Sequence, residues 1–248
     1  MEHWELLLFF FAIALLYASV GFGGGSSYLA MLAWYEFPVA QVRLTSLLCN
    51  IVVVSGGTYT FHRHGHLNLR KSWPIVAFSV PAAFAGGALR LKEEVFFTLL
   101  GISLIIAALA MWWQASVLTR EVDKNRTTAY RPWHNAVLGG GIGFLSGLLG
   151  IGGGIFLAPM LHLLRWDNPK TIAATASFYI LVNSISGIFG QLTGPQANIN
   201  WTYTVFLMGA VFFGGLIGSQ LGAVWWKAST VKKVTAVLVA YIGFQILF

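Results

Sequence analysis

Two glycine-rich stretches contain the residues of this sequence that are best suited to bind a ligand. Residues 21–25 read GFGGG and residues 150–154 read GIGGG, and each interrupts an apolar run. Glycine is unfavourable inside a helix because it loses more backbone freedom on folding than any other residue. A helix that begins at such a break carries unpaired N–H groups at the positive end of its dipole. Two breaks that meet would therefore bind an anion without any charged side chain. The residues that supply these N–H groups are Gly23, Gly24, Gly25, Ser26, Gly152, Gly153 and Gly154.

Polar residues on the helix that follows each stretch are candidates for completing the site. Hydroxyl and amide donors three to five residues apart share one helix face, and they suit a tetrahedral or pyramidal oxyanion. Taken singly, such residues more often form hydrogen bonds between helices. Arg43, near the start of the first of these helices, either guards an entrance or extends to the lipid headgroups. The candidates are Thr45, Ser46 and Asn50 in the first half, and Thr175, Ser177, Asn183, Ser184 and Ser186 in the second.

The composition places these residues in a membrane protein. Of the 248 residues 57% are hydrophobic and only 9% are charged, whereas soluble domains carry about 25% charged residues. The formal charge of +7 does not indicate a nucleic-acid partner, because basic residues collect in the cytoplasmic loops of membrane proteins. The lipid bilayer is the expected partner. The single cysteine, Cys49, excludes an intramolecular disulfide and a multi-cysteine metal site.

The positions of the acidic residues favour an anionic substrate and argue against catalysis. All eight Asp and Glu lie at the ends of apolar runs or between them, whereas a cation transporter or a proton relay is expected to keep acids within the membrane. An intramembrane hydrolase needs an activated nucleophile with a base in reach, and a zinc enzyme needs three converging ligands. The spans provide neither set. No enzyme activity, metal or cofactor is therefore predicted, and the histidines of HRHGH at 62–66 are interpreted as a turn that faces the headgroups.

The two glycine stretches also mark an internal repeat. Each is followed by a Thr- and Ser-bearing segment, then by a glycine-containing segment (PAAFAGGALR or VFFGGLIGSQL), then by an apolar helix. We divide the chain into a first repeat over 1–113, a cytoplasmic linker over 114–133 and a second repeat over 134–248. Each repeat is a glycine-broken segment followed by three spans, an organisation typical of secondary transporters.

Charge distribution predicts how the repeats are oriented. If each repeat crosses the membrane four times, the 15 Lys and Arg divide almost evenly between the two sides. If each glycine break is the tip of a re-entrant hairpin, all of them except Arg43, Arg90 and Lys92 lie on one side, a strong positive-inside pattern. The second legs, 26–35 and 155–164, reach only about half of the bilayer at about 1.5 Å per residue. We therefore predict an all-α polytopic membrane protein of two inverted four-element repeats, with both termini outside the cell membrane.

The doubled motif resembles a known family. G-x-GGG occurs twice, the second copy continues to Pro159 and Leu161, and a Thr- and Ser-bearing helix follows each copy. In these features the sequence resembles the TauE/SafE sulfite exporters over essentially its whole length. The resemblance implies a multi-pass protein of the bacterial inner membrane that transports sulfite, organosulfonates or related anions. It implicates Gly21 and Gly150 beside the glycines already named. Ala30 stands where the second half has Pro159, so the two hairpins are not expected to be equivalent.

Together these observations predict a secondary transporter that moves a small sulfur-containing oxyanion by alternating access at two opposed half-helix N-termini. An anion channel is the alternative nearest in mechanism, and an intramembrane enzyme is the alternative from another class. Cys49 is a further open point, because a buried cysteine is usually a small hydrophobe but here would also be near a sulfur-containing substrate.

Overall fold

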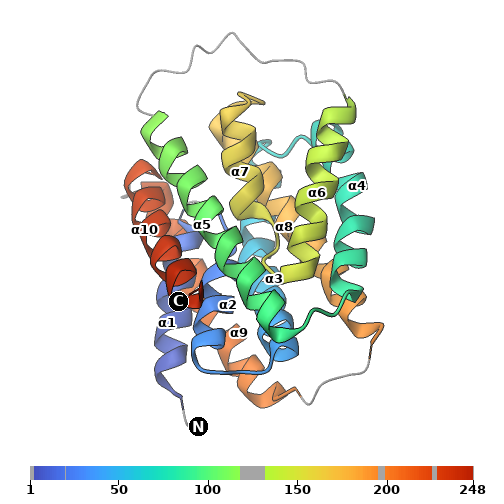
Figure 1. Ribbon diagram of the computed structural model, residues 1–248. Coiled ribbons are helices and arrows are strands. Elements are labelled where there is room, and N and C mark those ends of the chain that lie inside the picture. The colour runs from blue at the N-terminus through green and yellow to red at the C-terminus, as the bar shows by residue number, and fades with distance from the viewer. Residues whose placement is uncertain (1–2, 20, 118–131, 195–198, 225–227, 248) are drawn as a thin grey trace.

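The computed structural model describes residues 3–19, 21–117, 132–194, 199–224 and 228–247, and every regular element in these ranges is an α-helix. Residues 118–131 of the predicted linker lie outside the described residues, whereas its first residues continue a helix. The helices, shown in Figure 1, are α1 (Glu5–Ala18), α2 (Gly25–Trp34), α3 (Val39–Arg63), α4 (Leu69–Ala88), α5 (Glu93–Val117), α6 (Pro132–Leu149), α7 (Gly154–Leu163), α8 (Pro169–Leu192), α9 (Trp201–Val224) and α10 (Ala228–Leu247).

Asparagine side chains mark where three of the long helices begin. Asn68 Oδ1 accepts from the N–H of Lys71 at 3.1 Å, and Asn168 Oδ1 accepts from the N–H of Thr171 at 2.9 Å. Asn200 caps α9 in the same way. Each cap satisfies one of the unpaired N–H groups at a helix start. The helix α8 ends at Leu192, and α9 begins at Trp201, directly after its asparagine cap.

The outer surface of the helix bundle is apolar. Large hydrophobic side chains such as Phe78, Phe189 and Phe213 are exposed on α4, α8 and α9, which is unusual for a protein that faces water on all sides. Among the described residues, α3, α5, α8 and α9 have both the length and the hydropathy to cross a bilayer. The predicted polytopic helical membrane protein is therefore confirmed.

Both glycine stretches interrupt a helix, as predicted. Gly24 and Gly153 are the N-caps of the ten-residue helices α2 and α7, and both have left-handed backbone angles, with φ of +85° and +81°. A side chain would strain the backbone there. Figure 1 shows the chain reversing at each break: α7 returns toward the end where α6 begins, and α2 returns toward the end where α1 begins.

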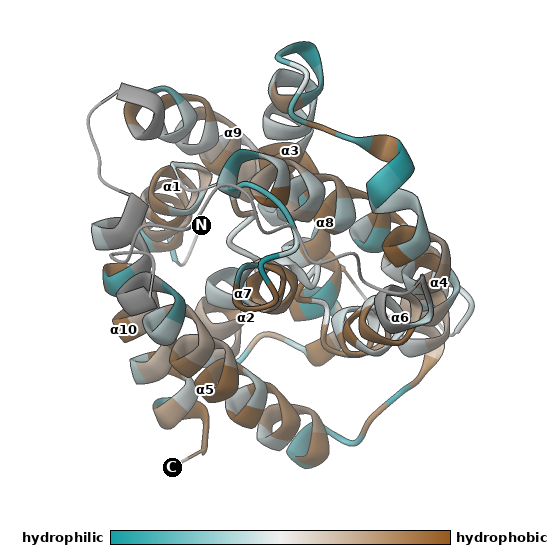
Figure 2. Cartoon of the chain, turned by 90° about the horizontal axis from the view of Figure 1, so that it is seen from above, coloured by the Kyte–Doolittle hydropathy of each residue, from teal (hydrophilic) through white to brown (hydrophobic). Residues whose placement is uncertain are grey.

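Helix packing follows the same plan in the two halves of the chain. When α1 to α5 are matched in order with α6 to α10, each packed pair has a packed counterpart. The packed pair α1 and α9 matches the packed pair α6 and α4, and the packed pair α2 and α10 matches the packed pair α7 and α5. The helices α3 and α8 pack on each other, as do α5 and α10. The two short helices α2 and α7 lie at the centre of the bundle, with the longer helices around them (Figure 2). The glycine breaks are therefore buried inside protein, the place where irregular backbone is tolerated at membrane depth.

Candidate functional site

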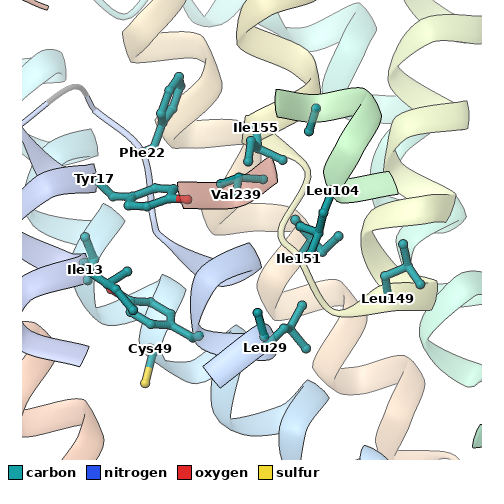
Figure 3. Packing of buried hydrophobic residues seen from close by; sticks show 14 of the residues in the cluster. Ile13, Tyr17, Phe22, Leu29, Cys49, Leu104, Leu149, Ile151, Ile155 and Val239 are labelled. Carbon is teal, nitrogen blue, oxygen red and sulfur yellow. The ribbon is translucent and has the colours of Figure 1, made fainter. Parts of the chain in front are cut away.

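The two glycine breaks meet at the centre of the molecule. A Cβ built on Gly25, the first residue of α2, would lie 2.5 Å from the carbonyl oxygen of Ile151 in the other break. Phe22 and Ile151, which occupy the same position in the two motifs, belong to one buried cluster (Figure 3). The chain thus brings together two stretches that lie about half its length apart.

Asn50, in the middle of α3, joins the two breaks. Its side chain is 0% exposed, and its Nδ2 donates to the Ile151 carbonyl oxygen at 3.0 Å. A Cβ on Gly23 or on Gly25 would overlap the Asn50 amide, and one on Gly152 would lie 2.6 Å from Nδ2. Glycine at these positions therefore lets the Asn50 amide approach both backbones. The Oδ1 of Asn50 has no hydrogen-bond partner, which is unusual for a buried amide oxygen.

Two helix N-termini converge at this point. The earliest hydrogen bonds of α2 run from the N–H groups of Ser27 and Tyr28 to the carbonyl oxygen of Gly24. In α7 the corresponding bonds run from Phe156 and Leu157 to Gly153. The N–H groups that precede them in each helix have no acceptor within the helix. The centre of the protein therefore carries the positive ends of two helix dipoles.

Serine hydroxyls surround the first break and are largely occupied. Ser46 Oγ donates to the Gly25 carbonyl oxygen at 2.8 Å, which fixes the start of α2 to α3. The hydroxyls of Tyr17 and Ser27 are 2.7 Å apart, and Ser26 Oγ lies 3.4 Å from the same Tyr17 oxygen. Ser46 and Ser26 thus lie beside the break, and their contact with substrate stays a prediction. Their hydrogen bonds also hold α1, α2 and α3 together.

Four of the other predicted residues are paired at other places. Thr45 bonds Thr204 of α9 at 3.0 Å, and Thr175 bonds Ser72 of α4 at 2.9 Å. Their hydroxyls thus link long helices to each other. Ser177 accepts from Thr58 of α3, and the Asn183 amide donates to the Tyr179 carbonyl oxygen within α8 while its Oδ1 has no partner. A contact of these four with substrate stays a prediction.

Arg43 is buried instead of extending into solvent. It is 6% exposed, and its guanidinium donates to carbonyl oxygens in the last turns of α4 and α6 and just beyond α4. Carbonyl groups at helix C-termini carry partial negative charge, so they accept a cation favourably. The Arg43 stem also packs against Gly150, where a Cβ would lie 3.1 Å from the Arg43 Cα and Cβ atoms. The four acceptors are Gly86, Gly87, Leu89 and Gly147.

A cavity of about 140 Å³ adjoins the first break. Its lining includes Gly21 and Phe22 of the break, and hydroxyls of α3, α8 and α9. Val54 also lines it, and the same side chain would lie 3.2 Å from a Cβ on Gly23. Val54 thus borders both this cavity and Gly23 of the break. The hydroxyl residues of the lining are Ser55, Ser177 and Ser219.

The charged residue nearest the centre is a cation, Arg43, and the described carboxylates lie away from it. Within the described residues the carboxylates are Glu5, Glu36, Glu93, Glu94 and Asp167, which lie at helix ends or between helices. No group of three His, Cys, Asp or Glu that would hold a metal occurs in the same residues. Cys49 is buried in the hydrophobic cluster (Figure 3). The buried cation of Arg43 therefore has only carbonyl partners, and the arrangement of donors suits an anion.

The structure adds polar residues that the sequence reasoning missed or did not rank. Among the described residues, the buried hydroxyls without a partner are those of Tyr28, Ser146, Ser184 and Thr235. The first three lie beside Gly24, Gly153 and Gly152 respectively. Tyr28 and Ser146 could have been suspected only from their nearness to the glycine motifs in sequence. Ser184 is one of the candidates that the sequence names in the second half without ranking them, and the fold places it beside Gly152.

Comparison with known proteins gives the family. The sulfite exporter TauE/SafE family model matches residues 6–246. A relative from Sinorhizobium fredii, named "Probable membrane transporter protein y4hK", is 34% identical over 98% of this chain and 97% of its own. YunE of Bacillus subtilis, a protein with the same type of name, is 24% identical over 92% of this chain and 91% of its own. No solved structure shows significant similarity to the chain. The relatives' names denote membrane transporters and not enzymes, and on this match over nearly its whole length the chain belongs to the TauE/SafE sulfite exporter family.

Proposed function

We propose that this protein is a secondary transporter for a small oxyanion, and that it binds the anion where the two glycine breaks meet. The observation that carries the proposal is the convergence of two helix N-termini on Asn50, in a centre whose neighbouring charge is the cation of Arg43. Helix N-termini and amide N–H groups are donors that bind oxyanions without a full counter-charge. The family name supports sulfite or an organosulfonate as the substrate class.

We infer that the repeats are inverted and that the breaks are hairpin tips entering from opposite faces. The reversal of the chain at each break and the matching helix packing in the two halves support this arrangement. With the positive-inside rule, it directs both termini to the periplasm of a bacterial inner membrane. Cysteines placed at position 2 or 248 of a Cys49-free protein are expected to react with an impermeant maleimide from the periplasm alone. Labelling from the cytoplasm would contradict the topology.

Alternating access is the proposed mechanism, because the lining of the cavity beside the first break includes Phe22 and Val54 and does not include Asn50. In an inverted-repeat transporter the two repeats rock about a fixed central site, which opens to one side at a time. An anion channel would instead need a continuous path. Saturable sulfite flux in proteoliposomes is the expected result, and single-channel currents would favour the channel.

The test of the site uses Asn50→Asp, a variant of nearly the same shape. A carboxylate at this position would place negative charge between two helix N-termini and would lose the hydrogen bond to the Ile151 carbonyl oxygen, so it is expected to repel the anion. Sulfite flux in proteoliposomes should fall at least tenfold, whereas Ser79→Ala, which removes a buried hydroxyl bonded within α4 at Val76, should keep it. Equal flux in the wild type and Asn50→Asp would exclude binding at the breaks.

A further inference from the structure

Ser184 is a buried hydroxyl that the packing of the protein leaves unused. It lies in α8, is 0% exposed, and its Oγ has no hydrogen-bond partner. A buried polar group without a partner is costly, so most such groups in proteins are satisfied. Other buried hydroxyls of this protein follow that rule, for example those of Ser46, Ser72 and Ser186. Four described hydroxyls do not, those of Tyr28, Ser146, Thr235 and Ser184, and Ser184 is distinguished by its place beside the Asn50 amide at Gly152.

The position of Ser184 identifies where a ligand would bind. A Cβ built on Gly152 would lie 3.2 Å from Ser184 Oγ and 2.6 Å from Asn50 Nδ2. Ser184 Oγ and Asn50 Nδ2 therefore both lie against Gly152, so close that only a glycine fits between them. Gly152 stands two residues before α7, so the unpaired N–H groups of that helix start are adjacent. Donors from α3, α8 and the α7 N-terminus thus converge.

The chemistry of this group of donors suits one oxygen of an oxyanion. The Asn50 amide nitrogen and the helix N–H groups only donate hydrogen bonds, and a serine hydroxyl turns to donate when it faces an acceptor. Resting on the proposed function, we propose that Ser184 is a substrate-binding residue, whose hydroxyl donates to the bound oxyanion beside Gly152. At the first break the hydroxyls of Ser26 and Ser27 are paired with Tyr17, and the unpaired hydroxyl of Tyr28 lies beside Gly24.

Removal of the Ser184 hydroxyl should change the sulfite affinity without lowering the melting temperature, which distinguishes a role in binding from a role in structure. Ser184→Ala deletes a group that lacks a protein partner, so the melting temperature should stay the same or rise. Sulfite affinity should fall about tenfold, which corresponds to about 1.4 kcal/mol, because the anion loses one hydrogen-bond donor. Binding is measured by calorimetry on the purified protein in detergent, and the flux by sulfite uptake into proteoliposomes.

Controls make the outcomes distinct. Ser79→Ala should bind sulfite as the wild type does, since the Ser79 hydroxyl bonds the Val76 carbonyl oxygen within its own helix. Wild-type affinity in Ser184→Ala, with sulfite binding intact, would overturn the role of Ser184 and leave the proposed transporter standing. A lower melting temperature in Ser184→Ala would overturn it too, because the hydroxyl would then have a structural partner. If the wild type binds neither sulfite nor methanesulfonate, the proposed function itself is wrong.

Discussion

Because the two breaks are in contact, a single methyl group added at Gly25 is predicted to lower the stability of the protein by an amount that can be estimated. In Gly25→Ala the new Cβ would lie 2.5 Å from the Ile151 carbonyl oxygen and would overlap the Asn50 amide. The Ile151 oxygen belongs to the backbone of the opposing break and cannot rotate away. Extra methyl groups forced into a packed site cost about 1–3 kcal/mol. About 1 kcal/mol shifts the melting temperature of a chain of this size by about 2–4 °C, so we expect a decrease of about 2–12 °C.

The matched control is Gly209→Ala in α9, where an added Cβ meets no atom within 4 Å. Alanine stabilises a helix interior by up to about 1 kcal/mol relative to glycine, so this variant should melt at or above the wild-type temperature. Both are measured by intrinsic tryptophan fluorescence on the purified protein in detergent. Gly25→Ala should cost less in an Asn50→Ala background than in the wild type, a partial recovery measured against Asn50→Ala alone, because one of the two overlaps is gone and the Ile151 carbonyl stays in place.

The result that would refute this reasoning is a Gly25→Ala protein as stable as Gly209→Ala. The two breaks would then not be in contact, and an anion site shared between them would have no structural basis. A full recovery in the double variant would show that only Asn50, and not the opposing backbone, limits the space at Gly25. In that case α2 would approach α3 and not the second break.

Three further predictions test other parts of the structure. Arg43→Met leaves four helix-end carbonyl oxygens without their donor, so the free energy of unfolding should fall by at least about 3 kcal/mol. Arg43→Lys should recover less than half of that loss, because an ammonium lacks the guanidinium fork. Equal melting temperatures for the wild type and Arg43→Met would contradict this role. The Lys71–Asp167 ion pair, 2.7 Å long with an exposed lysine, should contribute less than about 1 kcal/mol, so Lys71→Ala should shift the melting temperature little, and less still in high salt. Cys49, fully buried, should react with maleimide only after unfolding, and Cys49→Ala should transport sulfite at the wild-type rate. A lower rate would show that the thiol takes part in transport.

Much of the architecture could be predicted from the sequence, because a membrane imposes simple constraints. An apolar composition with charges confined to helix ends requires helices of bilayer length, and the two GxGGG motifs showed where that rule is broken. The bounds of α2 and α7 agree within a residue or two with the predicted second legs. The same motifs identified the family that the comparison confirms.

The choice among polar side chains was decided only by the tertiary structure. Thr45, Asn50, Thr175 and Ser184 are all polar residues on apolar helices, and nothing in the sequence ranks them. Helix packing pairs the two threonines with other helices, while it places Asn50 between the breaks and leaves Ser184 without a partner beside Gly152. Spacing along a helix determines which residues share a face, but the neighbours of that face come from contacts between distant segments. The sequence therefore determined that the breaks exist, and the fold alone decided which side chains meet them.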